Sequence, residues 1–274
     1  MAWWPLRCAV MACSFATALL GFEEKPWLGN QWEFFVDTSY SFSRFKTVAN
    51  STSHLQHPSN DNLFVIDLGF VPLEGWEAAV EVEFAQTPRQ SLGRRSAAAM
   101  VRMCLLDDIM GDAISLTVGG SIRQTAFVSL KDISCPSSAR WEVELHSAIG
   151  KEWSSGPDWM SRVYGIGALG QGSRGSPWTK AKVAFDLNKP ASHSWEFYSI
   201  GYWGFGRKHE VNIEHFKNWG SYDHSSIDLG VAYLQPIEEW GHFRFDLFHR
   251  IYARVYPRGV TGIMVAYHLP FSLL

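Results

Sequence analysis

The sequence predicts an all-β protein, an antiparallel transmembrane β-barrel of about 12 strands, with 14 as the alternative count. The first observation behind this prediction is that apolar and polar residues alternate with a period of two through most of the chain. Successive side chains on a strand point to opposite faces, so each alternating segment has one apolar and one polar face. The second observation is length, because the segments run for roughly 9–13 residues. An average strand has about 5–6 residues, and a transmembrane strand needs about 9–11.

The alternation begins at residue 32 and returns in about thirteen segments. It is clearest after the tight turn at 72–75, where Val80 and Val82 alternate with Glu81 and Glu83. The apolar residues that mark these segments fall within 32–42, 64–70, 76–84, 97–105, 114–118, 141–145, 159–169, 179–187, 195–197, 211–213, 227–233, 243–247 and 263–271. A bacterial single-chain barrel has an even number of strands, so about 12 is preferred. Two regions are uncertain: 122–135 could hide a strand, and a Gly-rich bend in 205–216 could make one strand look like two.

The N-terminus has the pattern of a secretory signal. Residues 1–7 contain one Arg and no acid, residues 8–21 are uncharged and mostly apolar or small, and Ala16-Thr17-Ala18 fits a cleavage site. We therefore predict a signal peptide at 1–18 and a single barrel domain at 19–274. Residues 8–21 are fewer than the about 20 that a membrane-spanning helix needs, so they do not predict a transmembrane helix. The alternative to a signal peptide is a buried N-terminal helix.

Composition excludes several classes of protein. Of the 274 residues, 46% are apolar, 15% aromatic and 19% charged, and the net charge is -3. A disordered chain would be less apolar and more strongly charged. A nucleic-acid-binding protein would have a basic excess, so no nucleic acid is expected as a partner. The mean hydropathy of -0.09 is too polar for a helical membrane protein.

Two architectures share this alternation. In a soluble β-protein the apolar faces meet in a core, whereas in a transmembrane barrel they face lipid. Tight turns such as 72–75 alternate with long polar connections such as 46–61, and the chain closes on an alternating segment, 263–271. Tryptophans gather at segment ends, as in the aromatic girdles of membrane barrels. The predicted girdle residues are Trp32, Trp76, Trp141, Trp159, Trp178, Trp195 and Trp240.

Over residues 27–274 these features resemble single-chain outer-membrane β-barrel proteins of double-membraned bacteria. The stretches LLDDIMGDAISLTVGG (105–120) and GQGSRGSPW (170–178) resemble uncharacterised outer-membrane proteins of chlamydia-like bacteria. The resemblance implies a bacterial outer-membrane location, and outer-membrane lipid and the barrel-assembly machinery as partners, with a homo-oligomer as an option. One departure concerns the C-terminal signal that this machinery recognises. The family's C-terminal signal usually ends on an aromatic residue, whereas here Ser272, Leu273 and Leu274 follow Phe271.

The polar faces predict a lumen of mixed charge. Acids come mostly from the first half of the chain and bases from the later half. The predicted lumen-lining residues are Glu33, Asp37, Glu77, Glu81, Glu83, Glu142, Glu144, Lys180, Lys182, Arg244 and Arg250. Charged linings tune selectivity, so we expect porin-like passage of small polar solutes or a structural membrane role. Alternatively, the charges pair into a closed interior.

Other functions are weaker alternatives. His224 and Ser226, with Asp223 adjoining, could form the His/Ser pair of an outer-membrane acyl hydrolase of the lipase type. A secreted soluble β-protein that binds a ligand is a second alternative. No metal or nucleotide motif is present, so we expect no cofactor and no metal. Cys104 and Cys135 remain after signal removal and are the candidates for a disulfide.

Overall fold

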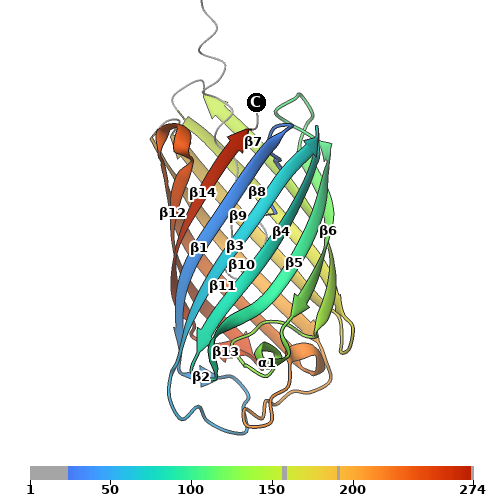
Figure 1. Ribbon diagram of the computed structural model, residues 1–274, viewed down its shortest axis with the longest axis vertical. Helices are drawn as coiled ribbons and strands as arrows, with labels where there is room; N and C mark the ends of the chain where they lie inside the picture. The colour runs from blue at the N-terminus through green and yellow to red at the C-terminus, as the bar shows by residue number, and fades with distance from the viewer. Residues whose placement is uncertain (1–23, 156–158, 190–191, 273–274) are drawn as a thin grey trace, which may run out of the picture.

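Twelve antiparallel strands close into a barrel (Figure 1). The structure, a computed structural model, describes residues 24–155, 159–189 and 192–272, so the predicted signal at 1–18 lies outside the described residues. The barrel strands are β1 Glu33–Phe45, β3 Ser59–Leu73, β4 Trp76–Thr87, β5 Gln90–Leu106, β6 Ser115–Thr125, β7 Trp141–Ser155, β8 Trp159–Gly172, β9 Trp178–Lys189, β10 His193–Phe205, β11 Asp223–Pro236, β12 His242–Arg254 and β14 Thr261–Ser272. The predicted fold is thereby confirmed.

The remaining elements are short and lie in connections. β2 Thr47–Val48 pairs with β13 Pro257–Arg258 in a separate two-stranded ribbon. The helical elements are α1 Phe127–Leu130, η1 Trp219–Ser221 and η2 Glu238–Trp240. Within the described ranges, no helix is long and apolar enough to cross a membrane.

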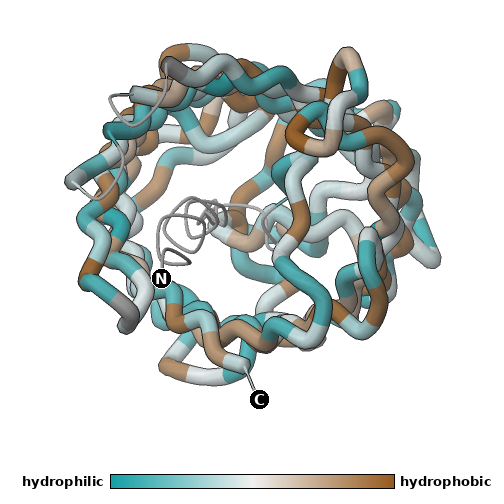
Figure 2. The backbone as a smooth tube through the Cα atoms, turned by 90° about the horizontal axis from the view of Figure 1, so that it is seen from above, coloured by the Kyte–Doolittle hydropathy of each residue, from teal (hydrophilic) through white to brown (hydrophobic). Residues whose placement is uncertain are grey.

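Each strand pairs with its neighbours in the chain, and β1 closes the ring by pairing with β14 from Glu33↔Ser272 to Arg44↔Thr261. Viewed from above, the strands form a continuous wall (Figure 2). Closure leaves no strand edge with unpaired backbone groups, which a bilayer-spanning sheet requires.

The connections differ between the two ends of the barrel. At the terminal end, where β1 begins and β14 ends, β3 and β4 are joined by a tight turn in which Gly75 adopts φ +74°. At the opposite loop end, residues 46–58, 126–140 and 206–222 form long connections (bottom of Figure 1). The predicted contrast between the tight turn at 72–75 and the long connection after residue 46 is confirmed. The two kinds do not alternate strictly, because residues 88–89 join β4 and β5 in a tight turn at the loop end.

One predicted segment is wrong. Val211 and Ile213 belong to the loop between β10 and β11, not to a strand. Val211 is fully buried against the apolar cluster at the loop end, so its spacing from Ile213 reflects loop packing. The other uncertain region also contains no additional strand, because β6 ends at Thr125 and α1 follows.

The apolar faces of the strands point outward. On β4, Val80 is 50% exposed whereas its neighbour Glu81 is 2% exposed. The same contrast appears on other strands, where Leu145 and Val183 are exposed and Lys182 is buried. A soluble β-protein would bury these apolar faces, so the alternative of a secreted soluble protein is wrong. The barrel instead has the apolar exterior of a membrane-spanning protein.

The predicted girdle tryptophans are exposed at strand ends, except Trp178. Placing Trp178 in the girdle is wrong, because it shares the inward phase of Lys180 and Lys182 on β9. Its indole Nε1 donates to Glu142 at 3.1 Å. Its ring also covers Gly170, where a Cβ would come within 2.1 Å of the indole.

Candidate functional site: the barrel lumen and its N-terminal segment

The acids on β4 point into the barrel and face arginines from the next two strands. Glu77 lies 2.6 Å from Arg102 on β5. Glu81 and Glu83 lie 2.9 and 3.4 Å from Arg123 on β6. The alternation on β4 predicts the direction of the three carboxylates, but Arg102 and Arg123 were not among the predicted lumen residues. They could have been found, because each lies on the inward phase of its own strand.

The opposite wall carries a second network of buried ion pairs. Glu196 on β10 lies 2.6 Å from Lys182 and 2.9 Å from Arg244. Arg250 on β12 makes a two-pronged contact with Asp228 on β11, at 2.7 and 2.9 Å. These ion pairs agree with the alternative hypothesis that the lumen charges pair with one another.

The other predicted lumen residues also lie at the inner wall or its rim. Asp37 is 2.6 Å from His268 on β14, and Glu142 accepts hydrogen bonds from Ser138 and Trp178. Glu33 differs, because it lies at the rim and accepts a hydrogen bond from the backbone N–H of Asn30 at 2.8 Å.

Residues 24–31, which we call the N-terminal segment, place their first residues inside the barrel. Glu24, Lys25, Pro26 and Trp27 are buried. The Lys25 ammonium lies 3.2 Å from Asp186 on β9 and 3.4 Å from Glu196 on β10. No periodic signal marks this segment, so the sequence reasoning missed it.

The wall also holds the main chain of the N-terminal segment. Arg102 donates from Nη1 to the Lys25 carbonyl at 2.9 Å, and Thr117 on β6 donates to the Pro26 carbonyl at 2.6 Å. Glu24 lies 2.7 Å from the Lys180 ammonium on β9. Strands β5, β6, β9 and β10 therefore all contact the segment, which bridges facing parts of the wall.

Trp27 anchors the segment near the terminal end. The Arg162 guanidinium lies 4.5 Å from the centre of the indole ring, and Tyr164 packs edge-on at 5.9 Å. The indole Nε1 donates to Asp108, in the turn between β5 and β6, at 2.9 Å. Burial raises the pKa of Asp108, but hydrogen bonds from Ser115, the Glu152 backbone N–H and Trp27 outweigh it, so this pKa lies below its ordinary value.

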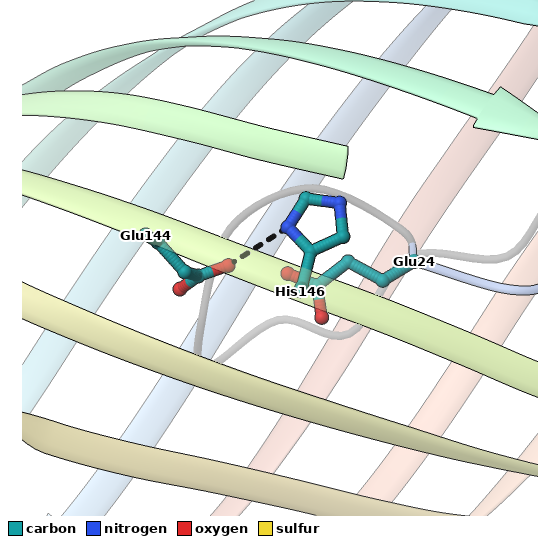
Figure 3. A group of neighbouring side chains, drawn as sticks. All are labelled: Glu24, Glu144 and His146. Carbon is teal, nitrogen blue, oxygen red and sulfur yellow. Dashed lines mark hydrogen bonds and ion pairs between the residues drawn. The ribbon is translucent and has the colours of Figure 1, made fainter. Parts of the chain in front are cut away.

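Glu24, Glu144 and His146 form a small cluster in the lumen (Figure 3). One potential ligand atom from each lies within 4.8 Å of the others, and His146 Nδ1 is 3.2 Å from Glu144. These are residue types that bind metals. The Lys180 ammonium, however, lies 2.7 Å from Glu24 and 3.8 Å from Glu144, so the two carboxylates already share a cation.

Loop 126–140 folds toward the barrel interior at the loop end. Arg95 donates to the Ser134 carbonyl at 2.6 Å, and Tyr202 donates to the Pro136 carbonyl at 3.4 Å. An apolar cluster lies beside this loop and includes Ile133, Val211 and Trp219, all nearly fully buried. Inward segments therefore occupy both ends of the barrel.

The candidate disulfide between Cys104 and Cys135 is not formed, because both thiols are free. Cys104 lies near the terminal end of β5, whereas Cys135 lies in loop 126–140 at the loop end. Strand β6 runs the height of the wall between them, and bridged Cα atoms must lie within about 7 Å.

His224 and Ser226 do not form the hydrogen-bonded pair that an acyl hydrolase requires. Both are buried on β11, but no hydrogen bond joins them in the described part of the chain. His224 Nδ1 instead lies 3.1 Å from the Tyr222 carbonyl oxygen, and its ring stacks on Tyr256. Asp223 is 2.6 Å from Arg254, so it does not orient the imidazole.

No protein-family model matches the sequence, and no curated protein matches it. Among solved structures, the barrel is similar to the COG4313 outer membrane channel from Pseudomonas putida F1. The identity is 12%, the TM-score is 0.65, and the match covers 88% of this chain and 96% of the channel. The NanC porin matches with 9% identity and a TM-score of 0.49, over 87% of this chain and 100% of the porin. The first similarity shows that the chain has the fold of an outer-membrane β-barrel.

Proposed function

We propose that the protein is an outer-membrane channel for small polar solutes that its own N-terminal segment holds closed. The observation that carries this proposal is the insertion of Lys25 between Asp186 and Glu196. The charged inner wall supports passage of polar solutes, because such a lining replaces part of the hydration that a solute loses. A purely structural role would not need a polar segment docked across that wall.

The segment can leave the lumen without unfolding the barrel. Strand β1 begins at Glu33, after the segment, and its pairing with β14 and β3 does not involve residues 24–31. The contacts that hold the segment are ion pairs, hydrogen bonds and ring contacts, all of which water or a solute can replace. The docked and released segments are therefore two states of one intact barrel.

The proposal places the protein in the bacterial outer membrane. The apolar exterior needs lipid, and short turns at the terminal end match the periplasmic turns of bacterial barrels. The proposal includes export by a cleaved signal and assembly by the barrel-assembly machinery. The proposal also includes a relationship to the outer-membrane proteins of chlamydia-like bacteria.

Conductance across planar lipid bilayers tests the proposal. The double substitution Glu24→Gln and Lys25→Gln removes the charges that pair with Lys180, Asp186 and Glu196. We expect the open probability to rise relative to the wild type.

The matched control is Glu74→Gln with Lys217→Gln, which removes the same charges from exposed positions and should leave the current unchanged. Heat-dependent gel mobility confirms that each variant is a folded barrel. The proposal is wrong if folded wild type and folded double variant both fail to conduct.

A further inference from the structure

The contacts of the N-terminal segment show which ligand chemistry the inner wall accepts. Lys180 receives a carboxylate, and Asp186 with Glu196 receives an ammonium group from the next residue. Arg102 and Thr117 receive two successive peptide carbonyls. Together these groups complement a peptide that carries an acid and an amine on neighbouring residues.

The wall is positioned mainly by its own contacts. Arg102 is held by Glu77 at 2.6 Å, and Glu196 is held by Lys182 and Arg244. Arg162, which receives the indole ring, is held by Glu152 at 2.6 Å. A binding surface held in this way keeps its geometry when its occupant leaves, which lowers the entropy lost on rebinding.

Two wall groups are left short of partners when the segment leaves. Lys180 keeps only Glu144, at 3.8 Å, among the ion pairs found in the described residues. Asp186 is 2% exposed, and its Oδ1 atom has no hydrogen-bond partner in the described part of the chain even while Lys25 is docked. A buried carboxylate and a buried ammonium that have each lost their shorter ion pair favour an occupant that supplies both opposite charges.

We propose that this wall is a binding site for short peptides that carry a carboxylate and an ammonium on adjacent residues, and that such peptides enter by displacing the N-terminal segment. The inference rests on the proposed function, because it names the solute class for the same lumen. A neutral sugar would replace neither of the ion pairs that Lys180 and Asp186 lose when the segment leaves. A solute with charge of one sign would replace only one of these two ion pairs.

The chain that links the segment to β1 sets the concentration of free peptide that is needed to displace the segment. A segment linked by a short chain has an effective concentration in the millimolar range, so a free peptide competes only at similar concentrations. Weakening the segment with Glu24→Gln and Lys25→Gln should lower that requirement. The full-length double variant is therefore the suitable protein for a binding measurement.

Isothermal titration of the detergent-solubilised double variant with acetyl-Glu-Lys-Pro-Trp-amide tests the inference. We expect saturable binding, and binding to the wild type that is weaker by about tenfold or more because the segment competes. Two control peptides, with the order Lys-Glu and with Gln-Gln in the charged positions, should each bind about tenfold more weakly or worse. The peptide controls require no further change to the barrel. If heat-dependent gel mobility shows that the double variant is not folded, the binding of the same three peptides to the wild type is compared at higher peptide concentration.

The outcomes separate this inference from the channel proposal. Equal binding of the three peptides, or no binding up to about 10 mM, overturns the inference even if the double variant conducts. Selective binding without any conductance supports the peptide site and refutes the channel. Selective binding together with block of the current by the Glu-Lys peptide supports both.

Discussion

Trp27 should control how often the N-terminal segment leaves the lumen. The indole is 5% exposed, donates to Asp108 and packs on Arg162 and Tyr164. Trp27→Phe removes the hydrogen bond to a charged acceptor, which contributes about 1.5–3 kcal/mol, and retains part of the ring packing. Trp27→Ala also removes the ring, for a total of about 3–5 kcal/mol.

These free energies convert directly into a shift between docked and released segments. Because about 1.4 kcal/mol is a tenfold change, Trp27→Phe should favour release by about 10–100-fold and Trp27→Ala by about 100-fold or more. Hydrogen exchange of the backbone amides of residues 24–31 measures this shift, and single-channel recording measures the resulting open time. Amide protection should fall, and the open time should rise, in the order wild type, Trp27→Phe, Trp27→Ala.

The control for this series is Trp141→Ala, which removes an exposed tryptophan from the outer face of β7 and should leave segment protection unchanged. The reasoning is refuted if Trp27→Ala gives a folded barrel with wild-type amide protection. A Phe variant that releases the segment more than the Ala variant would also contradict it.

Further predictions concern barrel stability, pH and the thiols. Arg250→Ala should lower the free energy of unfolding by about 3–5 kcal/mol, measured by denaturant titration, because Asp228 stays buried without its partner. The lowered pKa of Asp108 means that its carboxylate stabilises docking above the ordinary pKa of about 3.9. This contribution is lost as pH falls through the lower folded-state value, so segment protection should drop only in strong acid and not between pH 6 and 8. Cys135 is buried whereas Cys104 is half-buried, so a water-soluble thiol reagent at pH 8 should label Cys104 before Cys135. Because both thiols are free, reductant should not change thermal stability.

Local alternation was sufficient to predict the strands and to place their charged and apolar side chains on opposite faces. Side-chain direction on a strand has a period of two, so the pattern around Val80 and Glu81 separates the two faces without any tertiary information. The same rule places Trp178 inward with Lys180, and the girdle prediction failed at Trp178 because it considered position along the strand and not phase. The pattern at Val211 and Ile213 failed because a packed loop can bury alternate residues without forming a strand.

The sequence by itself determined the strands of this protein and their two faces, because strand periodicity and length are local properties of the chain. It could not decide whether the apolar faces point outward or into a core, since both arrangements have the same alternation. Only the tertiary structure decided that, together with the partners of the lumen charges. It also decided the position of the N-terminal segment, whose ion pair between Lys25 and Asp186 joins residues 161 positions apart. Such a contact depends on how the barrel closes around the segment, and no local pattern encodes it.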